Sequence, residues 1–137
     1  MPLPGWFARN VSGMISTSGK ALEWCRATLG RGAESWDSLF AEIEGVPAGA
    51  DRLLFLPYLA GERAPLWDPR ARGAFVGLTL NHGSTAMLRA VAESVGFAIR
   101  DVVAVMEELG LAVRDLRITG RPARNRAWNQ MRADITG

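Results

Sequence analysis

One stretch, residues 84–109, constrains the fold of this chain more than any other. Its charged and polar residues are few and grouped. Nearly every other residue in it is Ala, Val, Leu, Ile, Met or Phe. Arg89, Glu93, Arg100 and Glu107 fall on one helical stripe, and Ser94, Asp101 and Glu108 lie about a third of a turn away. We predict a long helix, capped by Ser84 or Thr85 and ended by Gly110, that is buried on most of its sides.

Shorter elements surround this helix. Apolar residues at helical spacing predict one helix in "STSGKALEWCRATLG", with Gly30 as its stop, and a second that Ser35 caps and that ends near Gly45–Pro47. The runs "RLLFLPYL", "AFVGLTL" and "LRITG" predict three short strands, and "AGERAPLWDPRARG" predicts an ordered loop. Residues 124–135 predict a closing helix. Helices alternating with strands indicate an α/β fold.

Composition places the chain among soluble globular proteins. It has 137 residues, of which 48% are hydrophobic and 22% charged, and no apolar run approaches the length that spans a bilayer. The start "MPLPGWFARN" shows no secretory leader. Cys25 is the single cysteine and lies in an apolar helical pattern, so we expect a buried thiol in a cytoplasmic protein.

Basic residues concentrate near the end of the chain. Residues 114–137 contain six arginines against two aspartates, Asp115 and Asp134. The arginines are Arg114, Arg117, Arg121, Arg124, Arg126 and Arg132. This surplus indicates an anionic neighbour, such as nucleic acid, ATP phosphates or an acidic partner surface, or else a solvated face without a ligand.

Other chemically suggestive residues have structural explanations. Glu62 and Asp68 resemble an acid–base pair, but ion pairing with Arg63 and Arg70 and turn formation account for them. His82 is the only histidine and is expected at the turn before the long helix; no second His or Cys nearby completes a metal site. The five tryptophans, at positions 6, 24, 36, 67 and 128, could serve as stacking platforms. Most of them, including Trp36 and Trp128, fall at helical apolar positions and are better explained as core residues.

The strand–turn–helix junction "ITGRPARN" is a candidate ligand site. A glycine at the end of a strand lets the backbone approach a ligand closely, and the following helix directs its first amide groups into the turn. Asn125 is suited either to hydrogen-bond a purine edge or ribose, or to cap the helix.

Several long motifs together resemble one family. "LLFLPYLAGERAPLWDPRARGAFVGLTLNH", "LRAVAESVGFAIRDV" and "ITG…AR…WNQMRADITG" are similar to the C-terminal half of FGGY-type carbohydrate kinases, with xylulose kinase-like members as the nearest relatives. The segment "STSGKALEW" also fits. The resemblance covers the chain from about residue 12 onward.

This resemblance implies a partial ribonuclease H-like, actin-like ATPase domain. In the family, MgATP binds the C-terminal lobe, sugar binds mainly the N-terminal lobe, and the γ-phosphoryl group passes to a sugar hydroxyl such as that of a pentulose. The family's adenosine-side turn falls on Gly120, Arg121, Pro122, Ala123 and Asn125. Gly120, Ala123 and Asn125 match it, whereas Arg121 and Pro122 replace residues with almost no side chain. Ser94 likewise replaces a glycine usual in the long helix.

The resemblance also implies missing parts. The family's catalytic aspartate, its N-terminal phosphate loop and its sugar-binding lobe have no counterpart here, so residues 1–137 are expected to form a single incomplete domain with no catalytic residue and no metal ligand of its own. We expect the isolated chain not to phosphorylate sugar, and to self-associate through apolar surface. Two alternatives stay open: a non-catalytic remnant or interaction module of the same fold, and, ranked last, an Arg-rich nucleic-acid-binding domain.

Overall fold

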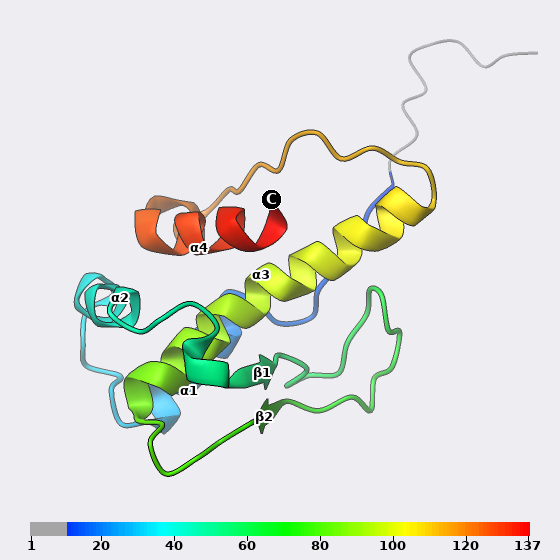
Figure 1. Ribbon diagram of the computed structural model, residues 1–137. Helices are drawn as coiled ribbons and strands as arrows, with labels where there is room; N and C mark the ends of the chain where they lie inside the picture. The colour runs from blue at the N-terminus through cyan, green and yellow to red at the C-terminus, as the bar shows by residue number, and fades with distance from the viewer. Residues whose placement is uncertain (1–10) are drawn as a thin grey trace, which may run out of the picture.

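A computed structural model describes residues 11–137 (Figure 1). The start "MPLPGWFARN", with Trp6, lies outside the described residues. The helices are α1 (Gly19–Thr28), α2 (Trp36–Glu44), α3 (Ser84–Glu108) and α4 (Arg126–Thr136). Two short 3-10 helices, η1 (Ala50–Arg52) and η2 (Arg121–Arg124), and two strands, β1 (Leu54–Leu56) and β2 (Ala74–Val76), complete the order of elements.

The long helix α3 is the centre of the molecule, as predicted. It packs against α1, α2, α4 and β1, and Figure 1 shows the other elements arranged along it. Residues 88–96 are all buried, because α3 is enclosed there by helices on several sides. Beyond Ala98 the helix is more exposed, and Val103 is its one fully buried residue in that part. Burial on most sides therefore holds for residues 88–96 and not for the whole of α3.

Close contacts fix α4 against α3. Gly96 provides the space: a Cβ atom at this position would lie 2.7 Å from Cδ1 of Ile135. The indole Nε1 of Trp128 donates a hydrogen bond to the carbonyl of Ala92 at 3.0 Å. Since residues 126–128 follow directly after the junction "ITGRPARN", this packing also fixes the start of α4 and the turn before it.

The sheet has two antiparallel strands, with Leu54 opposite Val76 and Phe55 opposite Phe75. Phe55 is buried in the core beside Phe75, and their ring centroids are 4.6 Å apart. The loop between the strands is ordered, as predicted, and is tied to the segment before α1. Ala64 N–H donates to the carbonyl of Met14 at 2.9 Å, and the Thr17 hydroxyl donates to the carbonyl of Pro57.

Two predictions about regular structure were wrong. Residues 116–120 form no strand, and within residues 11–137 the only sheet is the antiparallel pair. An isolated strand is not stable without a neighbour to take up its backbone hydrogen bonds, and no described strand lies beside this segment. Neither Ser84 nor Thr85 caps α3: its N-cap is Gly83, and the Thr85 hydroxyl donates to Glu42 instead.

The remaining caps were predicted correctly. The Ser35 hydroxyl accepts a hydrogen bond from the backbone N–H of Ser38 at 3.1 Å, and α2 ends at Glu44 with Gly45 as its C-cap. The helix α3 ends at Glu108, just before Gly110. In residues 11–137, no helix combines the length and the apolar character needed to cross a membrane.

Candidate functional site

The junction before α4 forms a tight turn, although no strand leads into it. Gly120 has a φ of +82°, a left-handed conformation that residues with a side chain rarely adopt. Its carbonyl accepts a hydrogen bond from the N–H of Ala123 at 3.2 Å, and η2 carries the chain on to α4. The Asn125 side chain caps α4 by accepting a hydrogen bond from the N–H of Trp128 at 2.8 Å. The capping role of Asn125 is therefore confirmed.

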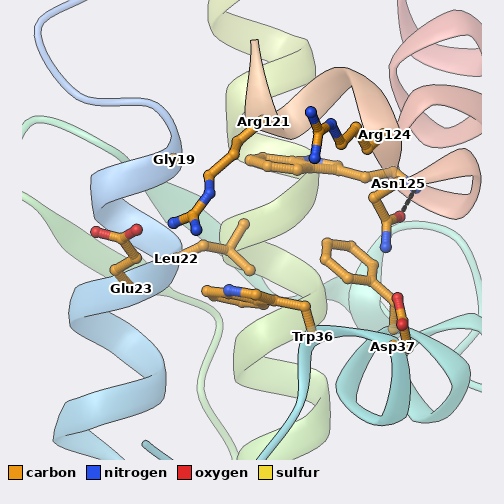
Figure 2. Close-up of a pocket in the computed structure, with 10 residues that line it drawn as sticks. Gly19, Leu22, Glu23, Trp36, Asp37, Arg121, Arg124 and Asn125 are labelled. Carbon is orange, nitrogen blue, oxygen red and sulfur yellow. Dashed lines mark hydrogen bonds between the residues drawn. The ribbon is translucent and has the colours of Figure 1, made fainter.

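A cavity of about 360 Å³ opens beside this turn. Three helices and the turn contribute to it (Figure 2). Its lining residues are Gly19, Leu22, Glu23, Trp36, Asp37, Phe40, Arg121, Arg124, Asn125 and Trp128. The volume falls within the range of small-molecule sites, and an apolar wall with a few polar groups is typical of them.

The apolar wall of the cavity is a row of three aromatic rings from two helices. Trp36 and Phe40 come from α2 and their ring centroids are 6.2 Å apart; Phe40 and Trp128 of α4 are 5.7 Å apart. Both pairs are tilted, a favourable arrangement for aromatic rings. The row links α2 to α4 and gives the cavity an apolar, polarisable wall of aromatic rings.

A guanidinium group packs on the tryptophan at each end of this row. Arg26 of α1 lies over the ring of Trp36 at 4.2 Å, and Arg132 of α4 lies over the ring of Trp128 at 3.7 Å. Both are cation–π contacts. Arg132 is only 5% exposed and has no carboxylate within ion-pair distance among the described residues. Burial lowers its pKa to about 10.

The basic and amide groups lie on the side of the cavity nearest the turn, whereas the carboxylates of Glu23 and Asp37 line it from α1 and α2. In Figure 2 the Arg121 side chain extends from the turn across the cavity toward Glu23 of α1. Arg124 lies on the same side, and the amide group of Asn125 points into the cavity. The Asn125 oxygen is used by the cap, so its NH₂ group is the part available to a ligand. The site thus offers an amide donor and two cations next to an aromatic wall.

An ionic network fixes α2, which carries Trp36 and Asp37. Arg31, in the α1–α2 connection, donates to Glu34 at 2.6 Å and to Glu42 of α2 at 2.8 Å. The hydrogen bonds from Arg31 lower the pKa of the Glu34 carboxyl. Arg31 also reaches the Thr85 hydroxyl at 3.3 Å, so the network links α2 to the first turn of α3.

The structure brings together part of the predicted nucleotide turn. Arg121 and Asn125 line the cavity, and Gly120 makes the turn that places them there. Ala123 lies instead at a second cavity, which α3, α4 and residues 113–118 line, and Pro122 is described only as a backbone position within η2. The sequence did not predict Gly19, Glu23 and Asp37 as site residues, because they lie in α1 and α2, far from the turn along the chain. It assigned Trp36 and Trp128 to the core, and both also line the cavity.

The other candidate residues take part in turns and local hydrogen bonds. Asp68 pairs with Arg70 at 3.2 Å, and hydrogen bonds from Arg70 lower the pKa of its carboxyl. Glu62 is buried and accepts hydrogen bonds from the backbone N–H groups of Ser16 and Arg63. The expected ion pair with Arg63 is not formed, because the Arg63 guanidinium reaches the Met14 sulfur instead. The Nδ1 atom of His82 accepts a hydrogen bond from the backbone N–H of Thr79, in the same turn, at 2.9 Å. No group of three metal-ligating side chains occurs within residues 11–137.

Comparisons with known proteins identify the class of protein. Residues 8–137 match the family model described as the FGGY family of carbohydrate kinases, C-terminal domain. The chain therefore belongs to this family of phosphotransferases, and the resemblance noted in its motifs is confirmed.

Several members of the family are close relatives. The chain is 37% identical to the xylulose kinase of Escherichia coli over 127 residues and 38% identical to the gluconokinase of Bacillus subtilis over 135 residues. Those alignments cover 93% and 91% of this chain. The crystal structure of xylulose kinase from Rhodospirillum rubrum superimposes with a TM-score of 0.81 at 36% identity, over 90% of this chain.

The matches cover much less of the relatives themselves. The chain spans 26% of the length of both of those curated kinases and 25% of the solved Rhodospirillum rubrum chain. Its helices and small sheet thus correspond to one part of a larger kinase fold. A glycerol kinase from Plasmodium falciparum, crystallised with ADP, shares the fold at 24% identity.

Proposed function

We propose that this chain supplies the adenine-nucleotide side of the cleft of an ATP-dependent sugar kinase. In this proposal residues 1–137 are a single incomplete domain, containing most of the C-terminal, ATP-side lobe of a ribonuclease H-like, actin-like ATPase fold. The complete enzyme transfers the γ-phosphoryl group of ATP to a sugar hydroxyl. The isolated chain binds nucleotide and does not phosphorylate sugar.

One observation carries the proposal. The turn that aligns with the family's adenosine-side motif lines the same cavity as Trp36 and Trp128. A purine ring needs a flat apolar surface and one or two hydrogen-bond donors or acceptors at its edge, and its phosphates need cations. The cavity offers the aromatic row, the NH₂ group of Asn125 and the guanidinium groups of Arg121 and Arg124, beside the carboxylates of Glu23 and Asp37.

The hydrogen-bond donors and cations of the cavity fit a nucleotide, with one difference from the family's adenosine-side turn. The family's turn approaches its ligand through residues with almost no side chain, whereas here Arg121 projects a guanidinium toward the cavity. The Arg121 guanidinium therefore binds the phosphates through its positive charge, whereas small residues at this position would bind them through backbone N–H groups. ATP supplies the phosphoryl group when bound. Because the described residues contain no cluster of metal-ligating side chains, we assign no Mg²⁺ ligand to this chain.

The proposal names a class of sugar substrate, whereas it names the nucleotide as ATP. A pentulose such as xylulose agrees with the relatives named xylulose kinase, but gluconokinases are equally similar to this chain. The residues that choose the sugar belong, in this proposal, to a sugar-binding lobe beyond these residues. We therefore propose a carbohydrate kinase of the xylulose kinase or gluconokinase type, with the pentulose as the first substrate to test.

A remnant of the same fold is the second candidate. It is favoured by Arg121 and Pro122, which depart from the family's turn, and it predicts a cavity that has lost nucleotide binding. A nucleic-acid-binding domain ranks third. Of the six arginines near the end of the chain, Arg132 is buried against Trp128 and Arg121 and Arg124 line the cavity, which leaves no continuous basic face assembled from all six.

Isothermal titration with ADP and with ATP separates the first two candidates. The proposal predicts one saturable site for each nucleotide, and the remnant predicts no heat of binding. A coupled assay with ATP and xylulose or gluconate, run on the same preparation, is predicted to show no turnover. Salt-sensitive binding to generic DNA, without binding of ADP, is the outcome that the third candidate requires.

A further inference from the structure

The two faces of the Trp36 ring have different neighbours. In Figure 2 the ring is seen nearly edge-on, with one face turned toward Leu22 and the Arg121 guanidinium, which also line the cavity. The guanidinium of Arg26 lies over the same ring at 4.2 Å from its centroid, and Arg26 does not line the cavity. Arg26 therefore covers the ring from outside the cavity and leaves the other face open to a ligand.

The helix α1 places Arg26 behind the ring. Glu23 lines the cavity, and Arg26 follows it by three residues, so the two side chains lie on the same side of α1. This side of the helix thus passes from the cavity to the back of Trp36 within one turn. The arrangement involves only α1, α2 and the connection between them, so it is complete within the described residues.

A hydrogen bond and a ring contact hold the Arg26 guanidinium in place. Its Nη1 donates to the carbonyl of Glu34 at 2.9 Å, and Arg31 in turn donates to the Glu34 carboxylate at 2.6 Å. Glu34 lies two residues before Trp36, so this bond ties Arg26 to the start of α2.

The ring contact explains a cost that the hydrogen bond does not. The Nε atom of Arg26 is buried and has no hydrogen-bond partner within residues 11–137. A buried donor without a partner is unfavourable. The cation–π contact with Trp36 offsets this cost, because a guanidinium over an indole face is attracted to the ring electrons.

An ordered ring favours ligand binding. Trp36 is only partly buried at the edge of the core, so its packing alone leaves room for other orientations of the ring. A ligand that stacks on a mobile side chain must order it, and this loss of conformational entropy weakens binding. A group that fixes the ring beforehand removes this cost without touching the ligand.

We propose that Arg26 is a positioning residue for the nucleotide, which holds the Trp36 indole in one orientation so that its free face stacks on the purine ring. The inference rests on the proposed function, because it requires a cavity that binds nucleotide. It assigns Arg26 an effect on the base and none on the phosphates, although Arg26 is a cation.

Arg26→Met tests this assignment, because methionine has a similar length but neither charge nor a planar group. In isothermal titration the variant is predicted to bind adenosine and ADP about fivefold more weakly than wild type, by the same factor for both. A cation that attracts the phosphates from a distance would affect ADP and not adenosine. A loss confined to ADP, or no loss for either ligand, overturns the proposal.

Arg100→Met is the matched control. Arg100 is an exposed residue of α3 that does not line the cavity, and its substitution changes the net charge by the same amount. The variant is predicted to bind adenosine and ADP as wild type does. An equal loss in both variants would show a general effect of charge and would overturn the assignment to Arg26.

Fluorine NMR of protein labelled with 5-fluorotryptophan observes the ring directly, without ligand. The Trp36 signal is predicted to be one narrow line in wild type and to broaden or split in Arg26→Met, as the ring exchanges between orientations. The Trp128 signal is the internal reference, because Trp128 is covered by Arg132 at 3.7 Å and should stay unchanged.

The two measurements separate this inference from the proposed function. An unchanged Trp36 signal in Arg26→Met, in a protein that binds ADP, overturns the inference and leaves the nucleotide site standing. Wild type that binds neither adenosine nor ADP overturns the proposed function, and this inference with it.

Discussion

The side-chain oxygen of Asn125 accepts a hydrogen bond from the backbone N–H of Trp128, 2.8 Å away, while the rest of the amide faces the cavity. One residue therefore begins α4 and contributes to the candidate nucleotide site. The two roles use different atoms, the oxygen for the cap and the NH₂ group for a ligand. They can be separated by substitution.

Asn125→Asp is predicted to keep the cap and lose the ligand contact. A carboxylate accepts the Trp128 N–H as well as an amide does and suits a helix N-terminus, so the free energy of unfolding should stay within about 0.5 kcal/mol of wild type. ADP affinity should fall about tenfold, because the amide donor is gone.

Asn125→Ala removes both groups and is the comparison variant. We expect it to lose about 1 kcal/mol of stability as well as ADP affinity. Urea unfolding and ADP titration of both variants give the comparison. Unchanged ADP affinity in Asn125→Asp would show that the Asn125 amide does not contact the nucleotide.

Arg121→Ala is predicted to weaken ADP binding about fivefold, as expected for loss of one exposed cation that meets phosphate. Adenosine, which lacks phosphate, should bind the variant and wild type equally well. Arg126→Ala is the matched control: Arg126 is an exposed arginine at the start of α4 and does not line the cavity. Equal losses for adenosine and ADP in Arg121→Ala would show that Arg121 acts on the shape of the turn and does not contact phosphate.

Gly61→Ala is predicted to destabilise the loop between the two strands. Gly61 has a φ of +73°, and a Cβ atom there would lie 2.7 Å from the carbonyl oxygen of Pro69 and 2.8 Å from its Cα. The obstacle is backbone that a side-chain rotation cannot move, so we expect a loss of roughly 2 kcal/mol or more in urea unfolding. Gly32→Ala is the control, because its nearest contact would be at 3.9 Å and the change should cost less than about 0.5 kcal/mol.

The buried thiol predicts a specific loss of stability in alkali. Burial raises the pKa of Cys25 from 9.0 to about 11. A thiol whose pKa is raised on folding stabilises the protein below its unfolded value, and this contribution is lost as the pH rises from 9.0 toward about 11. Stability should therefore fall by up to about 1 kcal/mol per pH unit in that window. Cys25→Ala should remove this part of the pH dependence, and an identical profile for the variant would contradict the account.

Local signals in the sequence predicted most of the helices and their ends. Ser35 and Asn125 cap the helices that their positions indicated, and Gly110 follows the end of α3. These features depend on neighbours within one turn of helix, which a sequence displays directly. The prediction of a strand at residues 116–120 was wrong because a strand depends on a partner that is distant in the sequence. Residues 11–137 provide no such partner.

The residues of the candidate site also fall into two groups: those that are consecutive in the sequence and those that only the packing brings to the cavity. The turn at residues 120–125 was recognisable because its residues are consecutive and resemble a family motif. Gly19 and Glu23 were not recognisable, since only the packing of α1 beside the turn brings them to the cavity. Trp36 and Trp128 were assigned to the core from their helical spacing, and spacing alone cannot show that a ring at the edge of the core also faces a cavity.

Photolabelling with 8-azido-ATP, followed by mass spectrometric mapping of the labelled peptides, tests the central claim most directly. The claim is that the cavity between α1, α2 and the turn before α4 holds the purine ring. The account predicts labelling in the peptides that contain Trp36 and residues 121–128, suppressed by excess ADP. Labelling elsewhere, or labelling that ADP does not suppress, would contradict it.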